Sequence, residues 1–384
     1  MKGEMTGKQR LTAALKGEPV DRVPIWLREG FPIAEPFPEP DDFTRGWQYD
    51  HIYQDLFRDI SPYADAILGW GFGGWANRFL MTPPHRIHTR ETMVGADLKR
   101  VEGVVDTPRG DLVFVDEVKR GCATGWHVKT LVESVDDLKK LAEVPFEFAP
   151  SDIEPSIDGY RRAHEEVEDR GIVRLGISSP MVCISGCMKL EMFLELSLTE
   201  KALFHELLEE ITRRNLILID AVFKGRSLDT IVNFGGSEQC TPPLMPPSGF
   251  DEFVVPYDGQ LVERLKEYNI LVTCHCHGKI RHALRCMIDI GFDSTDPVEP
   301  PPAGDVTYAQ AREIADGAIT LIGNLEHDEL CFADPTQIRK RVKDIMELGH
   351  DRLILGSSAG PISAITPRLA DNYRAWIEAA LANC

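Results

Sequence analysis

The fold is decided by the run Ile270-Leu271-Val272-Thr273-Cys274-His275, which is followed by an amphipathic stretch, Lys279–Ile290, and by a second short run, Phe292–Asp296. The short runs predict strands, and the longer stretch between them predicts a helix. Because the helix carries the chain back along the sheet, the two strands of such a unit run parallel.

The same alternation recurs along the chain. Eight strands are predicted, at Val23–Trp26, Ala64–Leu68, Ile172–Ile177, Thr230–Phe234, Ile270–His275, Phe292–Asp296, Ala318–Gly323 and Arg352–Gly356. Helices are predicted at Gly7–Leu15, Met188–Leu198, Lys201–Phe223, Phe250–Tyr268, Lys279–Ile290, Tyr308–Ala315, Pro335–Leu348 and Ile365–Ala382. We expect Thr6 to cap the first helix and Gly17 to end it. Eight such units favour an α/β fold, a closed (β/α)8 TIM barrel, over the alternative of an open doubly wound sheet.

The gap between the second and third predicted strands is too long for one helix. It is rich in Thr, Val and Gly and contains three further candidate strands, Met93–Val105, Gly110–Val118 and Trp126–Val132. We therefore expect a single barrel domain over residues 1–384, with residues 85–132 forming a small antiparallel β insertion.

Composition and charge narrow the class of protein. Of 384 residues, 43% are hydrophobic and 27% are charged, which is typical of a globular chain. The formal net charge of −19 repels phosphate backbones, so we expect no nucleic-acid partner. No apolar run approaches the length of a membrane helix, and the N-terminus lacks the apolar core of a secretory signal. Nine scattered cysteines predict reduced thiols and a cytoplasmic location.

Active sites of such barrels lie at the C-terminal ends of the strands. The polar residues that follow the predicted strands are therefore the candidate site residues, and they include Arg28, Glu238, His275, His277, Asp296, Glu299, Asn324, Glu326 and Ser358. Carboxylates, imidazoles and glycine-rich turns thus converge at one end of the predicted barrel.

The most specific motif is Cys274-His275-Cys276-His277. Because side chains alternate along a strand, the two histidines point one way and the two cysteines the other. Histidines facing the barrel mouth would place two imidazoles within reach of one ion, and zinc suits imidazole and carboxylate ligands. The cysteines then fit as small buried residues behind the strand.

Glu238, at the end of the neighbouring strand, is the natural third metal ligand, and Glu326 and Asp296 are weaker candidates. We therefore predict His275, His277 and Glu238 as both the catalytic and the metal-binding set. The alternative is that both histidines only form hydrogen bonds to a buried loop or to an anionic substrate.

Arg28 follows Trp26 at the first strand end. A guanidinium held beside an aromatic ring suits a carboxylate or an aromatic acid, so both residues are candidates for substrate binding. The alternative is a structural ion pair of Arg28 with Glu29 or another acid. Ser358 lies in a turn before the last predicted helix, and such a turn favours an anion.

Several segments together resemble the uroporphyrinogen decarboxylase superfamily. They are Arg10–Trp26, Leu244–Pro247, Phe253–Tyr257, His275–Gly278 and Gly323-Asn324. The resemblance implies a (β/α)8 barrel, often dimeric, so a homodimer is expected. One branch of this superfamily removes carboxyl groups from a tetrapyrrole without a cofactor. The other moves methyl groups between a substrate, a corrinoid protein and a thiol or folate acceptor, usually with zinc.

The decarboxylase branch matches poorly. Arg28 could correspond to the first of that branch's two arginines, but Pro32 occupies the second position. The tyrosine of that branch has no counterpart near Pro180–Cys187, and its late histidine has none in Leu355–Ser358.

The methyltransferase branch matches better, with a departure. Its zinc is commonly held by a His-x-Cys pair and a late Cys. Here His275 matches, while His277 and Ser358 occupy the two cysteine positions. The changed ligands make a thiol acceptor less suitable and favour an oxygen-containing substrate.

The resemblance thus implies an enzyme that moves a methyl group from a small methylated donor, such as a methoxylated aromatic, to a separate corrinoid protein. Trp26 or Trp126 could clamp an aromatic ring, and Asp296, Asn324, Glu326 and Ser358 complete the expected substrate-binding set. The chain lacks a corrinoid-binding Asp-x-His-x-x-Gly motif, so the corrinoid is expected in trans. The alternatives are a lyase acting on a small carboxylic acid and a barrel that only binds a ligand.

Overall fold

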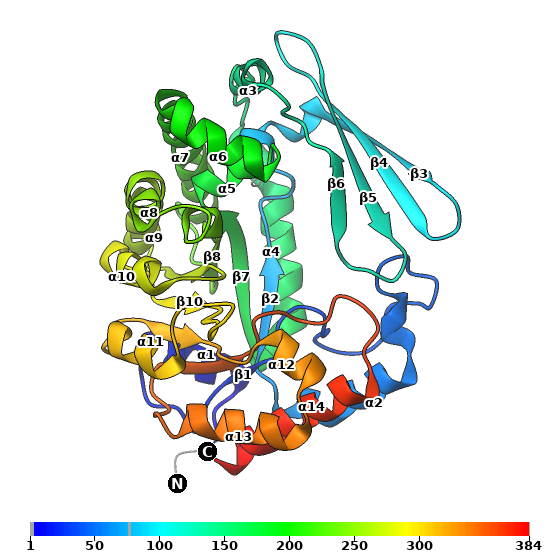
Figure 1. The fold of residues 1–384 in the computed structure, drawn as a ribbon, viewed down its shortest axis with the longest axis vertical. Coiled ribbons are helices and arrows are strands. Elements are labelled where there is room, and N and C mark those ends of the chain that lie inside the picture. Colours follow the sequence, from blue (N-terminus) through cyan, green and yellow to red (C-terminus); the bar gives the residue numbers. More distant parts are fainter. Residues whose placement is uncertain (1–3, 76–77, 384) are drawn as a thin grey trace.

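The computed structural model describes residues 4–75 and 78–383 and contains an eight-stranded parallel sheet curved into a nearly closed barrel (Figure 1). The barrel strands are β1 (Ile25–Trp26), β2 (Ala66–Trp70), β7 (Gly171–Ser178), β8 (Ile231–Gly235), β9 (Leu271–His275), β10 (Ser294–Asp296), β11 (Thr320–Ile322) and β12 (Leu353–Gly356). Their order in the sheet is β1-β12-β11-β10-β9-β8-β7-β2. All eight predicted strands are present, and the (β/α)8 barrel is confirmed.

The seam of the barrel lies between β1 and β2. β1 pairs in parallel with β12, and β2 pairs in parallel with β7. Each seam strand is therefore hydrogen-bonded to a neighbouring strand on the side away from the seam. Across the seam, the backbone N–H of Asp65 donates a hydrogen bond of 2.7 Å to the carbonyl of Ile25. This contact places the starts of the two strands side by side.

Helices surround the barrel (Figure 1). They are α1 (Gly7–Lys16), α2 (His51–Ile60), α3 (Val135–Ala142), α4 (Glu154–Val167), α5 (Pro180–Ser185), α6 (Leu190–Thr199), α7 (Lys201–Phe223), α8 (Pro247–Phe253), α9 (Val255–Glu267), α10 (Arg281–Ile290), α11 (Tyr308–Ala315), α12 (His327–Phe332), α13 (Pro335–Met346) and α14 (Pro367–Ala382). Within the ranges that the structure describes, no helix is long and apolar enough to cross a bilayer.

Two helix predictions need correction. The single helix expected over Phe250–Tyr268 is divided into α8 and α9 at Val254, where Pro256 lies in the first turn of α9. A proline lacks the N–H that would continue the preceding helix, so the chain starts a new one there. The helices α2, α3, α4, α5 and α12 were not predicted.

The antiparallel insertion after β2 is confirmed. Its four strands are β3 (Ile87–Met93), β4 (Leu98–Val105), β5 (Leu112–Lys119) and β6 (Gly125–Lys129), paired in chain order. The strand predicted at Met93–Val105 covers the last residue of β3, a turn and the whole of β4, and the rest of β3 was not predicted. The sheet lies beside the barrel (Figure 1). Two backbone hydrogen bonds hold its β5–β6 turn against other parts of the chain. Gly121 donates to the carbonyl of Phe43, and Ala123 donates to the carbonyl of Ile362, which follows β12.

Helix α1 closes the N-terminal end of the barrel. Thr6 caps it through a reciprocal capping box with Gln9, and Gly17 ends it at φ 72°, as the sequence predicts. The apolar face of α1 packs on residues from several barrel strands, which form one cluster with it: Leu11, Ala14, Leu15, Trp26, Ile172, Ile231, Ile322 and Ile354.

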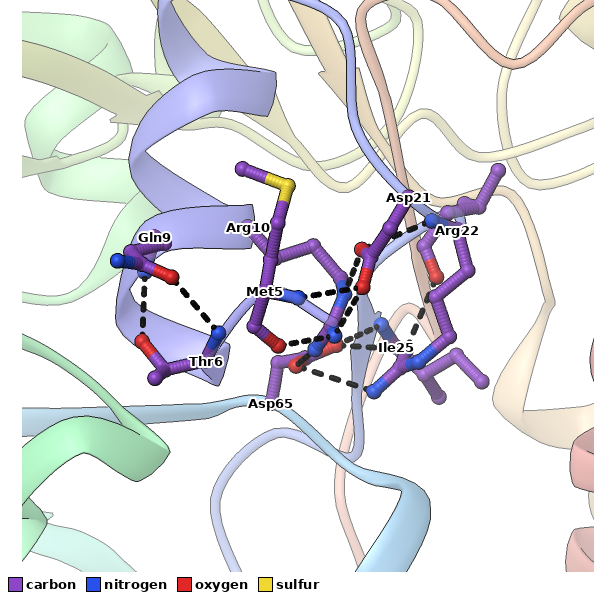
Figure 2. A network of polar contacts seen from close by, with 9 residues as sticks. Met5, Thr6, Gln9, Arg10, Asp21, Arg22, Ile25 and Asp65 are labelled. Atoms are coloured by element: carbon purple, nitrogen blue, oxygen red, sulfur yellow. Dashed lines mark hydrogen bonds and ion pairs between the residues drawn. The ribbon is translucent and has the colours of Figure 1, made fainter. Parts of the chain in front are cut away.

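A buried ionic network fixes α1 to the barrel seam (Figure 2). Arg10 donates to Asp21 at 2.7 Å and to the buried Asp65 at 2.5 Å. Asp65 also accepts from the Arg22 guanidinium at 2.9 Å and from the Ile25 N–H at 2.9 Å. One carboxylate therefore links the first helix, the segment before β1 and the start of β2.

Candidate functional site

The end of β9 presents its histidines to the barrel mouth and buries its cysteines. The side chains of His275 and His277 are 25% and 36% exposed. Cys274 and Cys276 are buried, and burial raises the pKa of both thiols well above the ordinary value. The predicted alternation is therefore present, and the two thiols stay protonated behind the strand.

Each histidine is held by a carboxylate from the segment around β10. The Nδ1 atom of His275 lies 3.1 Å from Oδ2 of Asp296, and the Nδ1 atom of His277 lies 2.8 Å from Oε1 of Glu299. The N–H of Gly278 donates to the other Glu299 oxygen at 2.6 Å. The two rings are perpendicular, at 86°, with centroids 4.6 Å apart. Because Nδ1 is engaged in both rings, Nε2 is the nitrogen that each can offer to a ligand.

Asp296 is fully buried and also binds Arg28. The guanidinium donates to Oδ2 of Asp296 at 2.6 Å and to the carbonyl of Ser357 at 3.2 Å. Burial opposes ionisation of Asp296, but the charges of Arg28 and His275 outweigh it and hold its pKa well below the usual range. Arg28 thus forms the structural ion pair that was the alternative to substrate binding. Its main partner is Asp296, and Glu29 lies farther away, at 3.5 Å.

The His277 ring favours its protonated form. Its burial lowers the pKa, but the hydrogen bond to Glu299, with further attraction from Glu299 and Glu238, outweighs burial and raises it. Burial likewise opposes the charge on Glu299, and its bonds from His277 and Gly278 lower its pKa overall. The pair therefore behaves as a partly buried imidazolium and carboxylate.

Glu238 begins the short turn that follows β8 and lies near enough to His277 to attract its charge. Its Oε2 atom is buried and has no hydrogen-bond partner in the described part of the chain. A carboxylate oxygen without a partner and two imidazoles are donor types that zinc binds, so the chemistry of these residues fits the ion. Even so, the ligand atoms of His275, His277 and Glu238 do not all lie within 4.8 Å of one another.

The ends of β11 and β12 contribute Glu326 and Ser358. The Ser358 hydroxyl donates to Oε1 of Glu326 at 2.8 Å and accepts from the N–H of His327 at 2.9 Å. Burial raises the pKa of Glu326, and its Oε2 atom has no partner among the described residues. This carboxyl is therefore suited to carrying a proton.

The other residues predicted to bind substrate contact protein groups or lie outside the barrel. Asn324 is buried, and its amide donates to the Val298 carbonyl and accepts from Arg341. Trp26 is 3% exposed, and the guanidiniums of Arg28 and Arg174 lie 4.7 and 5.1 Å from its ring centroid. Trp126 lies outside the barrel, in β6, and is half exposed.

The sequence places Glu299 among the polar residues that follow the strands, but it was assigned no catalytic, substrate-binding or metal-binding role. Its position after the sixth predicted strand was visible, but nothing in the sequence showed which side chain it would face. Asp296 and Glu299 lie three residues apart, and a bend in the chain aims one at each histidine.

Known proteins resemble this chain over nearly its full length. A methylcobamide:CoM methyltransferase, MtaA, of Methanosarcina barkeri is 22% identical over 98% of both chains. A chloroplastic uroporphyrinogen decarboxylase of Arabidopsis thaliana is 23% identical over 92% of this chain and 82% of its own. The structure of a methyltransferase from Methanosarcina mazei superposes with a TM-score of 0.62 over 99% of both chains, at 17% identity, which shows a common fold.

The family model for uroporphyrinogen decarboxylase (URO-D) matches residues 117–381, well over half of the chain. The matched range contains six of the eight barrel strands, all except β1 and β2. It also contains the barrel-mouth residues Glu238, His275, His277, Asp296, Glu299 and Glu326. This chain belongs to the uroporphyrinogen decarboxylase family.

Proposed function

We propose that this enzyme transfers a methyl group from a small methylated donor, such as a methoxylated aromatic, to a corrinoid carried by a separate protein. The observation that carries the proposal is the pair of imidazoles at the end of β9, each held at Nδ1 by its own carboxylate. Metal-binding histidines in proteins are typically oriented in this way, with the second nitrogen left for the ion.

His275, His277 and Glu238 would hold zinc, which acts as a Lewis acid on a leaving oxygen when it is bound. Asp296 and Glu299 orient the two rings, and Arg28 keeps Asp296 ionised. The likeness to a methylcobamide:CoM methyltransferase supports corrinoid-linked methyl transfer in this family member.

The residues of the mouth also supply a proton. In the proposed reaction the methyl–oxygen bond breaks, the methyl group passes to the corrinoid of the partner, and the leaving oxygen takes a proton. Glu326 would donate that proton, since burial favours its protonated form and one of its oxygens has no partner in the described chain. Ser358 holds the other oxygen and so fixes the direction of the carboxyl group.

The arrangement of Arg28 favours this proposal over a lyase that acts on a small acid. A lyase of that kind needs a cation to receive the substrate carboxylate, but the buried guanidinium of Arg28 is already bound by Asp296. The cytoplasm remains the expected location, and a homodimer the expected assembly.

The test is methylation of reduced cobalamin, followed by absorbance, with a panel of methoxyarenes and methylamines as donors. We expect transfer with at least one donor and a loss of about 100-fold or more in His277→Ala. His88→Ala is the matched control, since His88 also contacts a carboxylate, Asp106 at 2.9 Å, but lies on β3 of the insertion. Carbon dioxide release from small acids without any cobalt methylation would replace this proposal with the lyase.

A further inference from the structure

We infer that a second metal site, separate from the barrel mouth, joins the outer helices α8 and α10. Its ligands are Asp251 of α8 and His282 and Cys286 of α10. Among the described residues, this is the group of three ligand types whose donor atoms all lie within 4.8 Å of one another. The inference does not depend on the proposed function.

Two of the three distances between the ligand atoms match the edges of a zinc tetrahedron, and the third is shorter. Nε2 of His282 lies 2.7 Å from Oδ1 of Asp251, and Sγ of Cys286 lies 3.4 Å from each of these atoms. With metal–ligand bonds of about 2.0–2.3 Å, tetrahedral ligands stand roughly 3.4–3.6 Å apart. An increase of about 0.7 Å in the distance between Nε2 of His282 and Oδ1 of Asp251 would therefore admit the ion.

The spacing on α10 supports a shared ligand face. His282 and Cys286 are four residues apart, so they project from the same side of the helix. Helix α8 packs against that side and brings Asp251 to it. The Asp251 and His282 side chains are 52% and 37% exposed, while Cys286 is buried. An ion can thus enter from solvent, keep water as its fourth ligand and bind the sulfur at the base of the site.

Zinc or another borderline divalent cation is the expected class of ion, because the set combines one thiolate, one imidazole and one carboxylate. On binding, the Cys286 S–H bond breaks, a metal–sulfur bond forms and the proton leaves to solvent. Burial and the Asp251 hydrogen bond raise the pKa of the free thiol to about 12, so binding competes with this proton. The affinity should rise by about tenfold per pH unit for one proton released.

The position of the site suggests what it stabilises. Helix α8 follows the segment that starts with Glu238, and α10 follows the segment that contains His277. An ion between α8 and α10 would therefore fix the two helices whose preceding loops carry barrel-mouth residues. The ion would therefore have a structural role. Its effect can be measured as a change in the stability of the protein, independently of any enzymatic activity.

The experiment titrates the metal-free full chain with Co²⁺ and follows the sulfur-to-cobalt charge-transfer band. We expect this band in the wild type, and we expect it to remain in the double variant His275→Ala/His277→Ala, because the predicted barrel-mouth ligands contain no thiolate. Cys286→Ser should lose the band and weaken binding at least ~100-fold. Cys331→Ser, which changes a partly buried cysteine of α12, should keep it.

A second measurement covers the case in which Cys286→Ser fails to fold. In the wild type, Zn²⁺ should slow alkylation of Cys286, read by mass spectrometry, and leave that of Cys331 unchanged. Zn²⁺ should also raise the Tm of the wild type but not that of His282→Asn. A wild type that shows no charge-transfer band, or equal alkylation of Cys286 with and without Zn²⁺, would overturn the inference.

Discussion

The Nδ1 atom of His277 lies 2.8 Å from the Glu299 carboxylate, and this contact favours the protonated form of the His277 ring. The carboxylate fixes both the orientation of the ring and the sign of its pKa shift. Because Glu299 also binds the N–H of Gly278, the loop after β9 cannot move without breaking a second bond. Orientation, charge and loop position are thereby coupled through one side chain.

Glu299→Gln should lower the pKa of His277 toward its ordinary value, because the neutral amide no longer attracts the imidazolium. A raised folded-state pKa stabilises the protein fully below the unfolded pKa of about 6.5 and loses that effect as the pH rises through the folded value. The variant should therefore lose more stability at pH 6 than at pH 8. NMR titration of the His277 ring and urea unfolding at both pH values measure the two effects. An unchanged titration of His277 would contradict the assignment.

Arg28→Met should destabilise the fold by about 3–5 kcal/mol, because it leaves the buried Asp296 carboxylate without its strongest partner. The depressed pKa of Asp296 gives stability that is present above the unfolded pKa of about 3.9 and is lost as the pH falls through the folded value. Without Arg28, acid unfolding should begin at a higher pH. Urea unfolding at a series of acidic pH values measures both the loss of stability and the pH at which acid unfolding begins. Adding Asp296→Asn should recover part of the loss, and a double variant as unstable as the sum of the single ones would count against the pairing.

Asp65→Ala should cost about 3–5 kcal/mol, since it removes the buried carboxylate that two guanidiniums and a backbone N–H share at the barrel seam. Asp136→Ala is the matched control. It breaks an ion pair with Arg109 of 2.6 Å, but both side chains are well exposed to solvent, so the loss of stability should be far smaller than in Asp65→Ala. Urea unfolding of the two variants measures the difference. Equal losses would show that the network does not hold α1 to the barrel.

Glu326→Gln should reduce methyl transfer by about 10²–10⁴-fold if Glu326 supplies the proton. The amide oxygen can still accept from Ser358, so the local structure is retained. Because burial raises the pKa of Glu326, its ionised form destabilises the fold above that pKa, and the variant should be at least as stable as the wild type at pH 8. Rates of methyl transfer measure the first effect, and thermal unfolding at pH 8 measures the second. Full activity in the variant would show that Glu326 does not supply the proton.

The amino-acid sequence was enough to predict the fold class and to place the two histidines of β9 opposite its two cysteines. The spacing of apolar runs predicted eight parallel strands, and the pleat of β9 separated His275 and His277 from Cys274 and Cys276. Both follow from local periodicity, which a strand imposes whatever surrounds it. The N-cap at Thr6 followed from the same kind of local rule.

Only the tertiary structure decided what each polar side chain faces. Arg28 pairs with Asp296, 268 positions away in the chain, and His277 pairs with Glu299 across a strand-to-strand connection. The group at Asp251, His282 and Cys286 likewise exists because α8 packs on α10. The closure of the barrel and the packing of its helices determine these partners. A local pattern of residues does not encode which distant side chains come into contact.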